Sequence, residues 1–471
     1  MVLIRLNARG MKLGHSFSGV LALLLACSPV MGGEREAARP TPNLDPWTGE
    51  GVSLGGILFP QLSYQMAAGT STTDPASLAV GRHDPNDYGV TQQALDFSLE
   101  ARLGDHLKLF ANYSAWVDRD HHWQDEFDEY YAKLRDLPLG LQLKGGRFFT
   151  QFGYENSERT GQWDFVDKNL APGRFVGESA ATIYGGEISL PIFARAERSS
   201  WRDRLSFSYG SVADTDPVSN ARSLAGARYD GDRAHWQNGL GTVDYTVVHA
   251  PSDAVRVSGG VSGAWGENDF GRQTELYGAH FEYLWRAAGA EARGEFFRWR
   301  TEAFVRHFGA EGSVNEEIKQ TALVPGVQAT RKNELFFAGL RLFGGTLVPI
   351  FKTRTVVVSP AVPPRKVTTT SVVPRTIRDD FTDTGLSTAA TYGFPGGHFQ
   401  AHLRGEYVSG LADTGLPERY RLSPAITWHP CAKLPVDFKL QYNYDHFSSG
   451  GDEHSVWAQF SLVWGRADSP L

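Results

Sequence analysis

The chain has few cysteines and almost no long apolar segments, and both shortages restrict how it can fold. Its 471 residues include two cysteines, Cys27 and Cys431. If Cys27 is removed with a leader, the remaining cysteine cannot form an internal disulfide. Beyond the N-terminal region no stretch approaches the roughly 20 consecutive apolar residues that a membrane-spanning helix needs. These shortages exclude a helical membrane protein and a disulfide-held fold.

Motifs of several common catalytic and cofactor sites are also missing. The sequence contains no H-E-x-x-H zinc motif, no C-x-x-C pair and no phosphate-binding loop. We therefore expect no enzyme activity and no cofactor, with a barrel enzyme kept as an alternative. The formal net charge of -7 gives no support for nucleic-acid binding.

What the chain does contain is strict alternation of apolar and polar residues, clearest between Leu95 and Val117. Successive side chains of a strand point to opposite faces, so this segment predicts a hairpin with one wholly apolar face. The polar face is interrupted by Phe110 and Trp116. Residues 104–106 supply the turn.

Similar alternation recurs along most of the chain. Short and long connections alternate between the segments, as in outer-membrane barrels with short periplasmic turns and long external loops. We predict an all-β, transmembrane antiparallel barrel of about 18 strands, with 16 as the alternative and 127–135 and 346–357 as the weakest segments. The predicted strands lie near 52–65, 93–103, 107–117, 127–135, 140–149, 181–190, 203–212, 241–249, 254–265, 275–286, 290–300, 333–343, 346–357, 380–394, 398–408, 418–429, 434–446 and 454–464. The longest external loops are predicted near 66–92, 150–180, 213–240, 301–332 and 358–379.

The N-terminal region resembles an export signal. Basic residues precede an apolar run, which predicts a signal peptide over 1–33, with Met11 as an alternative start. Acylation of Cys27 as a lipoprotein is a second interpretation. Residues 34–50 are polar and contain proline, and they are expected to form a short periplasmic lead.

The predicted barrel covers 51–465 and is followed by a short extension, 466–471. Barrel proteins commonly end on an aromatic residue that the assembly machinery reads, and here Trp464 precedes the extension. Aromatic residues near strand ends are typical of the girdles that meet the membrane interfaces. These residues are Tyr64, Tyr113, Tyr283, Trp285, Tyr407, Trp428, Tyr442, Tyr444 and Trp464.

The segment 118–129 is the densest run of metal-capable side chains. Its histidines, His121 and His122, are adjacent, so in an extended strand they would point apart and not chelate together. We prefer an acidic external surface that meets lipopolysaccharide through divalent ions, with a zinc site as the alternative.

The connection 150–180 is the candidate constriction. It combines charged and aromatic residues over about thirty positions. Gly146-Arg147-Phe148 precedes it, and the connection itself contains Phe152-Gly153, Asn156, the stretch Trp163–Asp167, and Arg174-Phe175 followed by Gly177-Glu178. This pattern resembles a group of Gram-negative porins that includes phosphate-selective and general outer-membrane porins. The resemblance implies an outer-membrane pore with this loop packed inside.

Charged residues at this connection have two interpretations. They either attract or repel permeating ions, or they form internal salt bridges that hold the loop. The pore or constriction candidates are Arg147, Arg159, Asp164, Asp167, Lys168, Arg174 and Glu178. Parity with the apolar face predicts further lumen residues, namely Asp96, Glu100, Arg102, Lys108, Glu282, Arg341, Arg404, Glu406, Asp437 and Lys439. Because both signs are present, the sequence predicts no strong ion selectivity.

The leading hypothesis is a porin that passes small hydrophilic solutes or ions by passive, size- and charge-filtered diffusion. An energised or metal- or ligand-specific receptor is the first alternative, although that class needs about 22 strands and a plugged lumen. A soluble secreted β protein is a further alternative. The expected partners are outer-membrane lipid and lipopolysaccharide, the barrel-assembly machinery and, in a homotrimer, two further copies of the chain.

Overall fold

The computed structural model describes residues 57–193, 200–213, 228–287, 294–326, 340–341, 347–348, 362–430, 435–448 and 450–465. The predicted signal peptide 1–33, the lead 34–50, the extension 466–471 and both cysteines lie outside the described residues.

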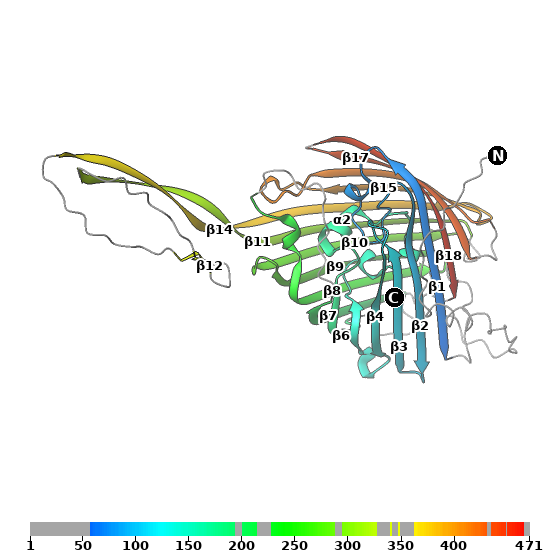
Figure 1. Cartoon of the computed structure of the whole chain (residues 1–471). Coiled ribbons are helices and arrows are strands. Elements are labelled where there is room, and N and C mark those ends of the chain that lie inside the picture. The colour runs from blue at the N-terminus through cyan, green and yellow to red at the C-terminus, as the bar shows by residue number, and fades with distance from the viewer. Residues whose placement is uncertain are drawn as a thin grey trace, which may run out of the picture. The chain divides into compact units, whose positions relative to one another are not determined.

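Sixteen antiparallel strands form a closed barrel in which consecutive strands pair and β1 pairs with β18 (Figure 1). Closure leaves no unpaired strand edge, which is the condition for a sheet to span a bilayer. The first eight strands are β1 (Leu58–Ser71), β2 (Gly89–Leu103), β3 (Leu107–Val117), β4 (Trp123–Leu134), β5 (Gln142–Phe149), β6 (Thr182–Leu190), β7 (Trp201–Val212) and β8 (Trp236–Ser252). The others are β9 (Val255–Asn268), β10 (Gln273–Arg286), β11 (Phe296–Gly326), β14 (Val362–Gly393), β15 (Phe399–Val408), β16 (Arg419–Trp428), β17 (Val436–Phe447) and β18 (Gly451–Gly465).

Short helices occupy the connections. They are α2 (Leu170–Val176) and the 3-10 turns η1 (Pro75–Ser77), η2 (Pro138–Gly140), η3 (Glu155–Ser157), η4 (Thr160–Gln162), η5 (Gly231–Ala234) and η6 (Ala412–Thr414). Within the described residues no helix is both long enough and apolar enough to cross a membrane.

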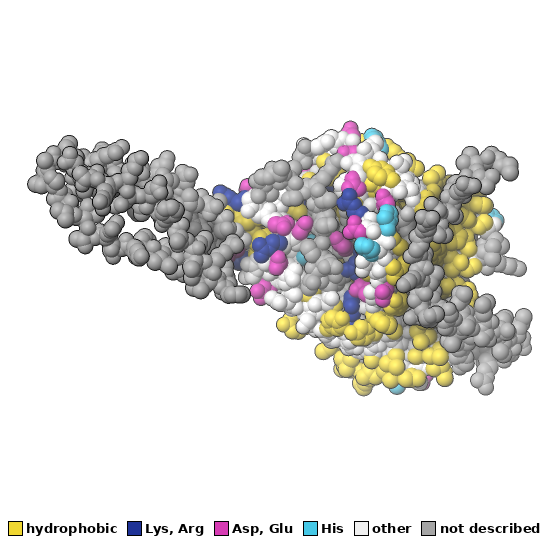
Figure 2. Space-filling view, viewed as in Figure 1, with side chains coloured by type: hydrophobic (Ala, Val, Ile, Leu, Met, Phe, Trp, Pro, Cys, Tyr) yellow, Lys and Arg dark blue, Asp and Glu magenta, His cyan; other side chains and the backbone are white. Residues whose placement is uncertain are grey.

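The strand faces are inverted relative to a soluble sheet. In β3 the side chain of Leu109 is 39% exposed, whereas its neighbour Lys108 is 5% exposed. Asp96 of β2 and Ser114 of β3 lie opposite each other and are both buried. Apolar side chains therefore cover the outside of the wall (Figure 2) and polar side chains line the lumen, which identifies an outer-membrane barrel.

The predicted hairpin 95–117 is confirmed as β2 and β3, which pair from Leu95 with Ala115 to Leu103 with Leu107. The count of 18 strands is wrong and the alternative of 16 is right. Of the segments 333–343 and 346–357 the structure describes β12 (Leu340–Arg341) and β13 (Leu347–Val348), which form a separate two-stranded sheet. The segment near 127–135, also considered weak, belongs to the barrel as β4.

The physical reason for the miscount lies in β11 and β14, which are neighbours in the barrel. Their pairing runs from Phe296 with Gly393 to Gly326 with Val362, well past the last β10 pair at Phe308. Much of the predicted loops 301–332 and 358–379 is therefore strand. Arg341 lies in β12, which is not one of the barrel strands.

Candidate functional site

Residues 150–181 connect β5 to β6 and cross the lumen; we call them the lumen segment. The Gly153 amide donates to the Ser262 hydroxyl of β9 at 3.1 Å, and the Val166 amide donates to the Gln441 side chain of β17 at 2.7 Å. The Leu170 amide donates to the Glu406 carboxylate of β15 at 2.5 Å. Because these acceptors face inward from strands far apart around the ring, the segment lies inside the barrel.

An apolar core inside the barrel holds one part of the lumen segment. Phe152 and Phe175 both stack on Phe304 of β11, with ring centroids 6.2 Å and 5.7 Å away. Leu240 of β8 and Leu276 of β10, both fully buried, belong to the same cluster. Inward positions are apolar on these strands because they meet a protein segment and not water.

Ion pairs hold a second part of the lumen segment, around Asp167. Its carboxylate accepts from Arg404 at 2.6 Å and from Arg421 at 2.9 Å. Gln441 and Asn443 also donate to it, at 2.6 Å and 3.0 Å. Burial alone would raise the pKa of the Asp167 carboxyl, but the two guanidinium groups lower it to about 2.

Further arginines extend this network along the wall. Arg419 and Arg421 of β16 both donate to the Asp445 carboxylate at 2.8 Å. Arg298 of β11 forms an ion pair with Asp164, and its guanidinium holds the pKa of that carboxyl below its usual range although burial acts in the opposite direction. We call Arg298, Arg404, Arg419 and Arg421 the arginine wall.

A second loop, residues 72–88 between β1 and β2, also packs inside. The Leu78 carbonyl accepts from Arg419 and Arg421 at 2.8 Å and 2.9 Å. The Asp84 carboxylate accepts from the amides of Val80, Gly81 and Lys168 at 2.7–2.8 Å. Burial, together with the charge of Asp167, raises the pKa of the Asp84 carboxyl to about 6, despite these three amides.

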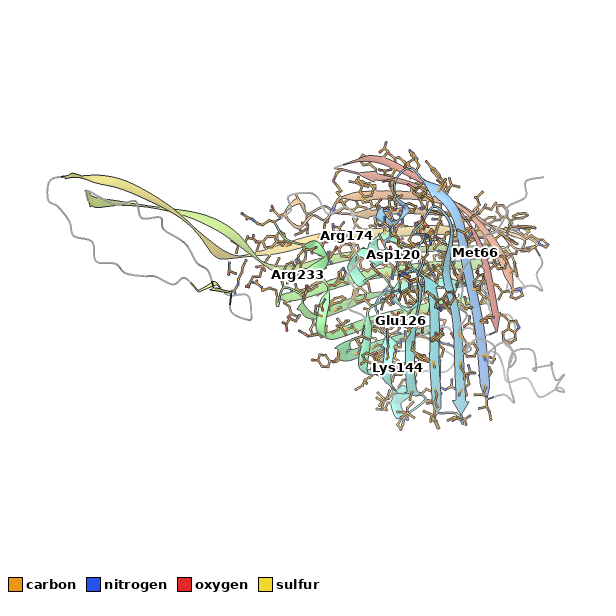
Figure 3. The ribbon with its side chains drawn as sticks, in the orientation of Figure 1. Met66, Asp120, Glu126, Lys144, Arg174 and Arg233 are labelled. Atoms are coloured by element: carbon orange, nitrogen blue, oxygen red, sulfur yellow. The ribbon has the colours of Figure 1, made fainter. Side chains whose placement is uncertain are left out.

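The remaining candidates of the lumen segment are also internally paired. The Lys168 ammonium donates to the carbonyls of Gly177 and Glu178 at 2.9 Å and 3.3 Å. Arg159 forms an ion pair with Glu129 of β4. Arg174 of α2 (Figure 3) donates to the Pro417 carbonyl at 2.7 Å and lies 3.7 Å from Asp383. Burial lowers the pKa of its guanidinium to about 10.

Arg147 occupies a different position from the other candidates. It pairs in register with Tyr130 and Tyr184, whose side chains are 43% and 44% exposed on the outside of the wall. Its guanidinium donates to the Glu126 carboxylate at 3.0 Å and to the Tyr184 hydroxyl at 3.3 Å. These contacts stabilise the loop end of β4 to β6.

The lumen candidates on β10, β15 and β17 also have partners. Glu282 accepts from Arg300 at 2.7 Å and from Arg256 at 2.5 Å. Arg404 lies 3.0 Å from Glu406. Asp437 pairs with His429, and the Lys439 ammonium donates to the Trp163 carbonyl.

Several residues that hold the lumen segment were not among the sequence candidates, although two signals in the sequence could have found them. Parity along β16 alone would have placed Arg419 and Arg421 in the lumen. Exceptions to the polar inner face, such as Leu276 and Phe304, mark where the wall meets the lumen segment. Lys133 and Lys144 were also overlooked, although both alternate with outward apolar neighbours.

One cavity of about 40 Å³ lies between η3, the Trp163–Asn169 stretch and strands β11 and β14, and its lining includes Glu155, Glu158 and Glu302. Burial raises the pKa of the Glu155 and Glu158 carboxyls. Among the described residues no group of three or more His, Cys, Asp or Glu side chains could hold a metal ion.

No protein-family model matches the chain, and no curated protein matches it either. Among solved structures it is similar to OmpF of Salmonella typhi, at 11% identity and a TM-score of 0.45, over 86% of this chain and 97% of that chain. It is also similar to the outer membrane channel DcaP of Acinetobacter baumannii, at 8% identity and a TM-score of 0.44, over 86% and 96% of the two chains. A third is the trimer form of OmpT, an outer membrane protein of Vibrio cholerae, at 9% identity and a TM-score of 0.43, over 86% and 98%.

Proposed function

We propose that the chain is a porin that passes small hydrophilic solutes or ions passively through its lumen, filtered by size and charge. The observation that carries this proposal is a polar inner wall crossed by a segment that is fixed to it by ion pairs and an apolar core. A segment held in this way narrows a pore to a defined size, because neither anchor allows it to swing freely.

The ion pairs of the lumen segment favour the interpretation that its charged residues form internal salt bridges that hold the segment. Asp164, Asp167, Arg159 and Arg174 each have an oppositely charged partner within the barrel. Their principal role in this proposal is to hold the segment, and ions would experience mostly the charges that remain unpaired.

The alternatives have less support. An energised receptor would need about 22 strands and a plug, whereas this barrel has sixteen strands. We propose no catalytic role, since the charged groups described above serve as partners of one another. Assembly as a homotrimer, recognition by the barrel-assembly machinery and contact with lipopolysaccharide remain predictions.

Liposome swelling tests the proposal. The full chain, folded into liposomes, should admit small sugars quickly and larger oligosaccharides progressively more slowly, because the segment limits the diameter. Liposomes with heat-unfolded chain serve as the control. Swelling no faster than this control would contradict the proposal.

A further inference from the structure

Two buried carboxyl groups, those of Glu155 and Glu302, line the cavity of about 40 Å³ beside η3. We call these two residues the acidic pair. Glu155 accepts from the Asn169 amide at 2.9 Å, and Glu302 accepts from the Tyr154 amide at 2.6 Å. Among the described residues neither member of the pair forms an ion pair. Buried carboxylates are ordinarily paired with a cation, so the acidic pair is unexpected unless something offsets its charge.

Two polar atoms at this cavity have no hydrogen-bond partner in the described part of the chain. One is the Oε2 atom of Glu155, whose side chain belongs to a residue that is 6% exposed. The other is the indole nitrogen of Trp163, a residue that lines the same cavity and is 7% exposed. A buried polar atom without a partner is destabilising. Two such atoms at one cavity therefore indicate a polar occupant.

The other carboxylates of the cavity already have cationic partners. Arg300 donates to the Glu158 carboxylate at 2.6 Å, and Arg298 forms an ion pair with Asp164. Asp167 belongs to the arginine network described above. A cation that enters the cavity would therefore find its uncommitted acceptors on the acidic pair.

The surroundings of the acidic pair suit an organic ammonium better than a metal ion. Three or more His, Cys, Asp or Glu side chains with the geometry for a metal are not found together among the described residues. The lining includes Tyr154, Trp163 and Phe165, and aromatic rings attract ammonium groups. The cavity of about 40 Å³ has room for about three water molecules, which matches a short alkylammonium.

We propose that the acidic pair binds a small alkylammonium cation, whose N–H groups donate to Oε2 of Glu155 and to the Glu302 carboxylate. A water molecule beside the cation would accept from the Trp163 indole. The inference deepens the proposed function and rests on it, because in the membrane the cation reaches the cavity through the lumen. Glu158 and Asp164 are partly exposed, so solvent reaches this side of the cavity.

Binding would exchange a proton for the cation. Burial raises the pKa of the Glu155 carboxyl well above its usual range. The charged groups that face it are Glu302 of β11 and Glu158 of the lumen segment, which act in the same direction, and Lys168, which opposes them. The empty cavity therefore favours the protonated, uncharged carboxyl. A bound ammonium replaces this proton, so its affinity should rise with pH.

Titration calorimetry with ethylammonium chloride tests the site on the full chain folded in detergent micelles. We expect saturable binding to wild type that strengthens from pH 6 to pH 8. The dissociation constant should be roughly tenfold higher in Glu155→Gln, which keeps an acceptor for the Asn169 amide but loses the charge. Glu267→Gln, which removes an exposed carboxylate at the end of β9, should bind as wild type does. Potassium chloride should give no saturable heat.

The site is wrong if wild type shows no saturable binding, if Glu155→Gln binds equally well, or if Glu267→Gln loses as much affinity. If Glu155→Gln does not fold, Glu302→Gln replaces it, with the same expected loss. Saturable heat from potassium chloride would overturn the choice of an ammonium. Because calorimetry needs no conduction, a chain that binds ethylammonium but carries no current would overturn the porin alone, and a conducting chain that does not bind would overturn the site alone.

Discussion

The arginine wall lies on the inner face of the barrel, and so does a second group of four cations on β2 to β5, which we call the basic row. The basic row consists of Arg102, Lys108, Lys133 and Lys144, which lie opposite one another on neighbouring strands. The surroundings of the two groups differ. Arg404 and Arg421 share the Asp167 carboxylate of the lumen segment, and Arg419 and Arg421 share Asp445. Lys133, at the centre of the basic row, has no such carboxylate among the described residues. A planar guanidinium suits several fixed acceptors at once, whereas an ammonium is a compact point charge. The comparison shows that cations on the same inner face differ in role: those of the arginine wall hold the lumen segment, whereas Lys133 lies beside like charges.

The largest expected difference in the free energy of unfolding comes from removing one cation from the arginine wall and, in a separate variant, one from the basic row. Arg421→Gln should lower the free energy of unfolding by about 3 kcal/mol, because it leaves Asp167 and Asp445 short of a partner in a buried network. Lys133→Gln should change it by less than about 1 kcal/mol, since it relieves repulsion from Lys108 and Lys144. Urea unfolding in lipid vesicles measures both. Equal losses would remove the distinction between the two regions.

A smaller effect concerns pH and the loop that lies against the arginine wall. The pKa of Asp84 is raised to about 6, so the folded protein binds its proton more tightly than the unfolded chain does. The stabilisation from this group is complete below about pH 4 and is lost as pH rises through 6, an effect of about 2–3 kcal/mol. Wild type should therefore lose stability relative to Asp84→Asn between pH 4 and pH 7. If the free energies of unfolding of the two proteins change equally between pH 4 and pH 7, the raised pKa of Asp84 is contradicted.

A third prediction concerns the entry of the lumen segment, which lies on neither charged region. Gly153 has a φ of +64°, and an added Cβ would lie 2.2 Å from the Glu302 carboxylate. Gly153→Ala should cost about 2 kcal/mol of unfolding free energy, because both the backbone and the contact are strained. Gly145→Ala is the matched control, since the nearest atom to its added Cβ is 3.9 Å away. If the two variants unfold alike, the segment does not enter the lumen at Gly153 as described.

Much of the barrel could be predicted from local pattern, because the alternation of apolar and polar residues in each strand shows which side chains face outward and which face inward. The range 107–117 coincides with β3, and 399–408 differs by one residue from its prediction. Alternation does not state which strand a segment pairs with, so 333–343 and 346–357 resembled barrel strands. Because β11 pairs directly with β14, no barrel strand lies between them. A count lower by two strands keeps the up-and-down order of the barrel.

The charge network was less accessible to sequence reasoning. Asp167 and Arg421 are separated by 254 positions, and only closure of the barrel around the lumen segment brings them together. The basic row is different, because Lys108, Lys133 and Lys144 lie close to short turns on successive strands. The correct register of two hairpins is enough to predict it from the sequence.

The most direct test of the central claim is the single-channel current of Asp167→Asn beside that of wild type. The account predicts discrete, long-lived openings in wild type. The variant should give larger and less uniform openings, because the lumen segment loses the carboxylate that binds it to Arg404 and Arg421. Asp120→Asn, at the exposed β3–β4 turn labelled in Figure 3, should match wild type. A silent wild-type barrel, or a folded Asp167→Asn channel with unchanged current, would contradict the account.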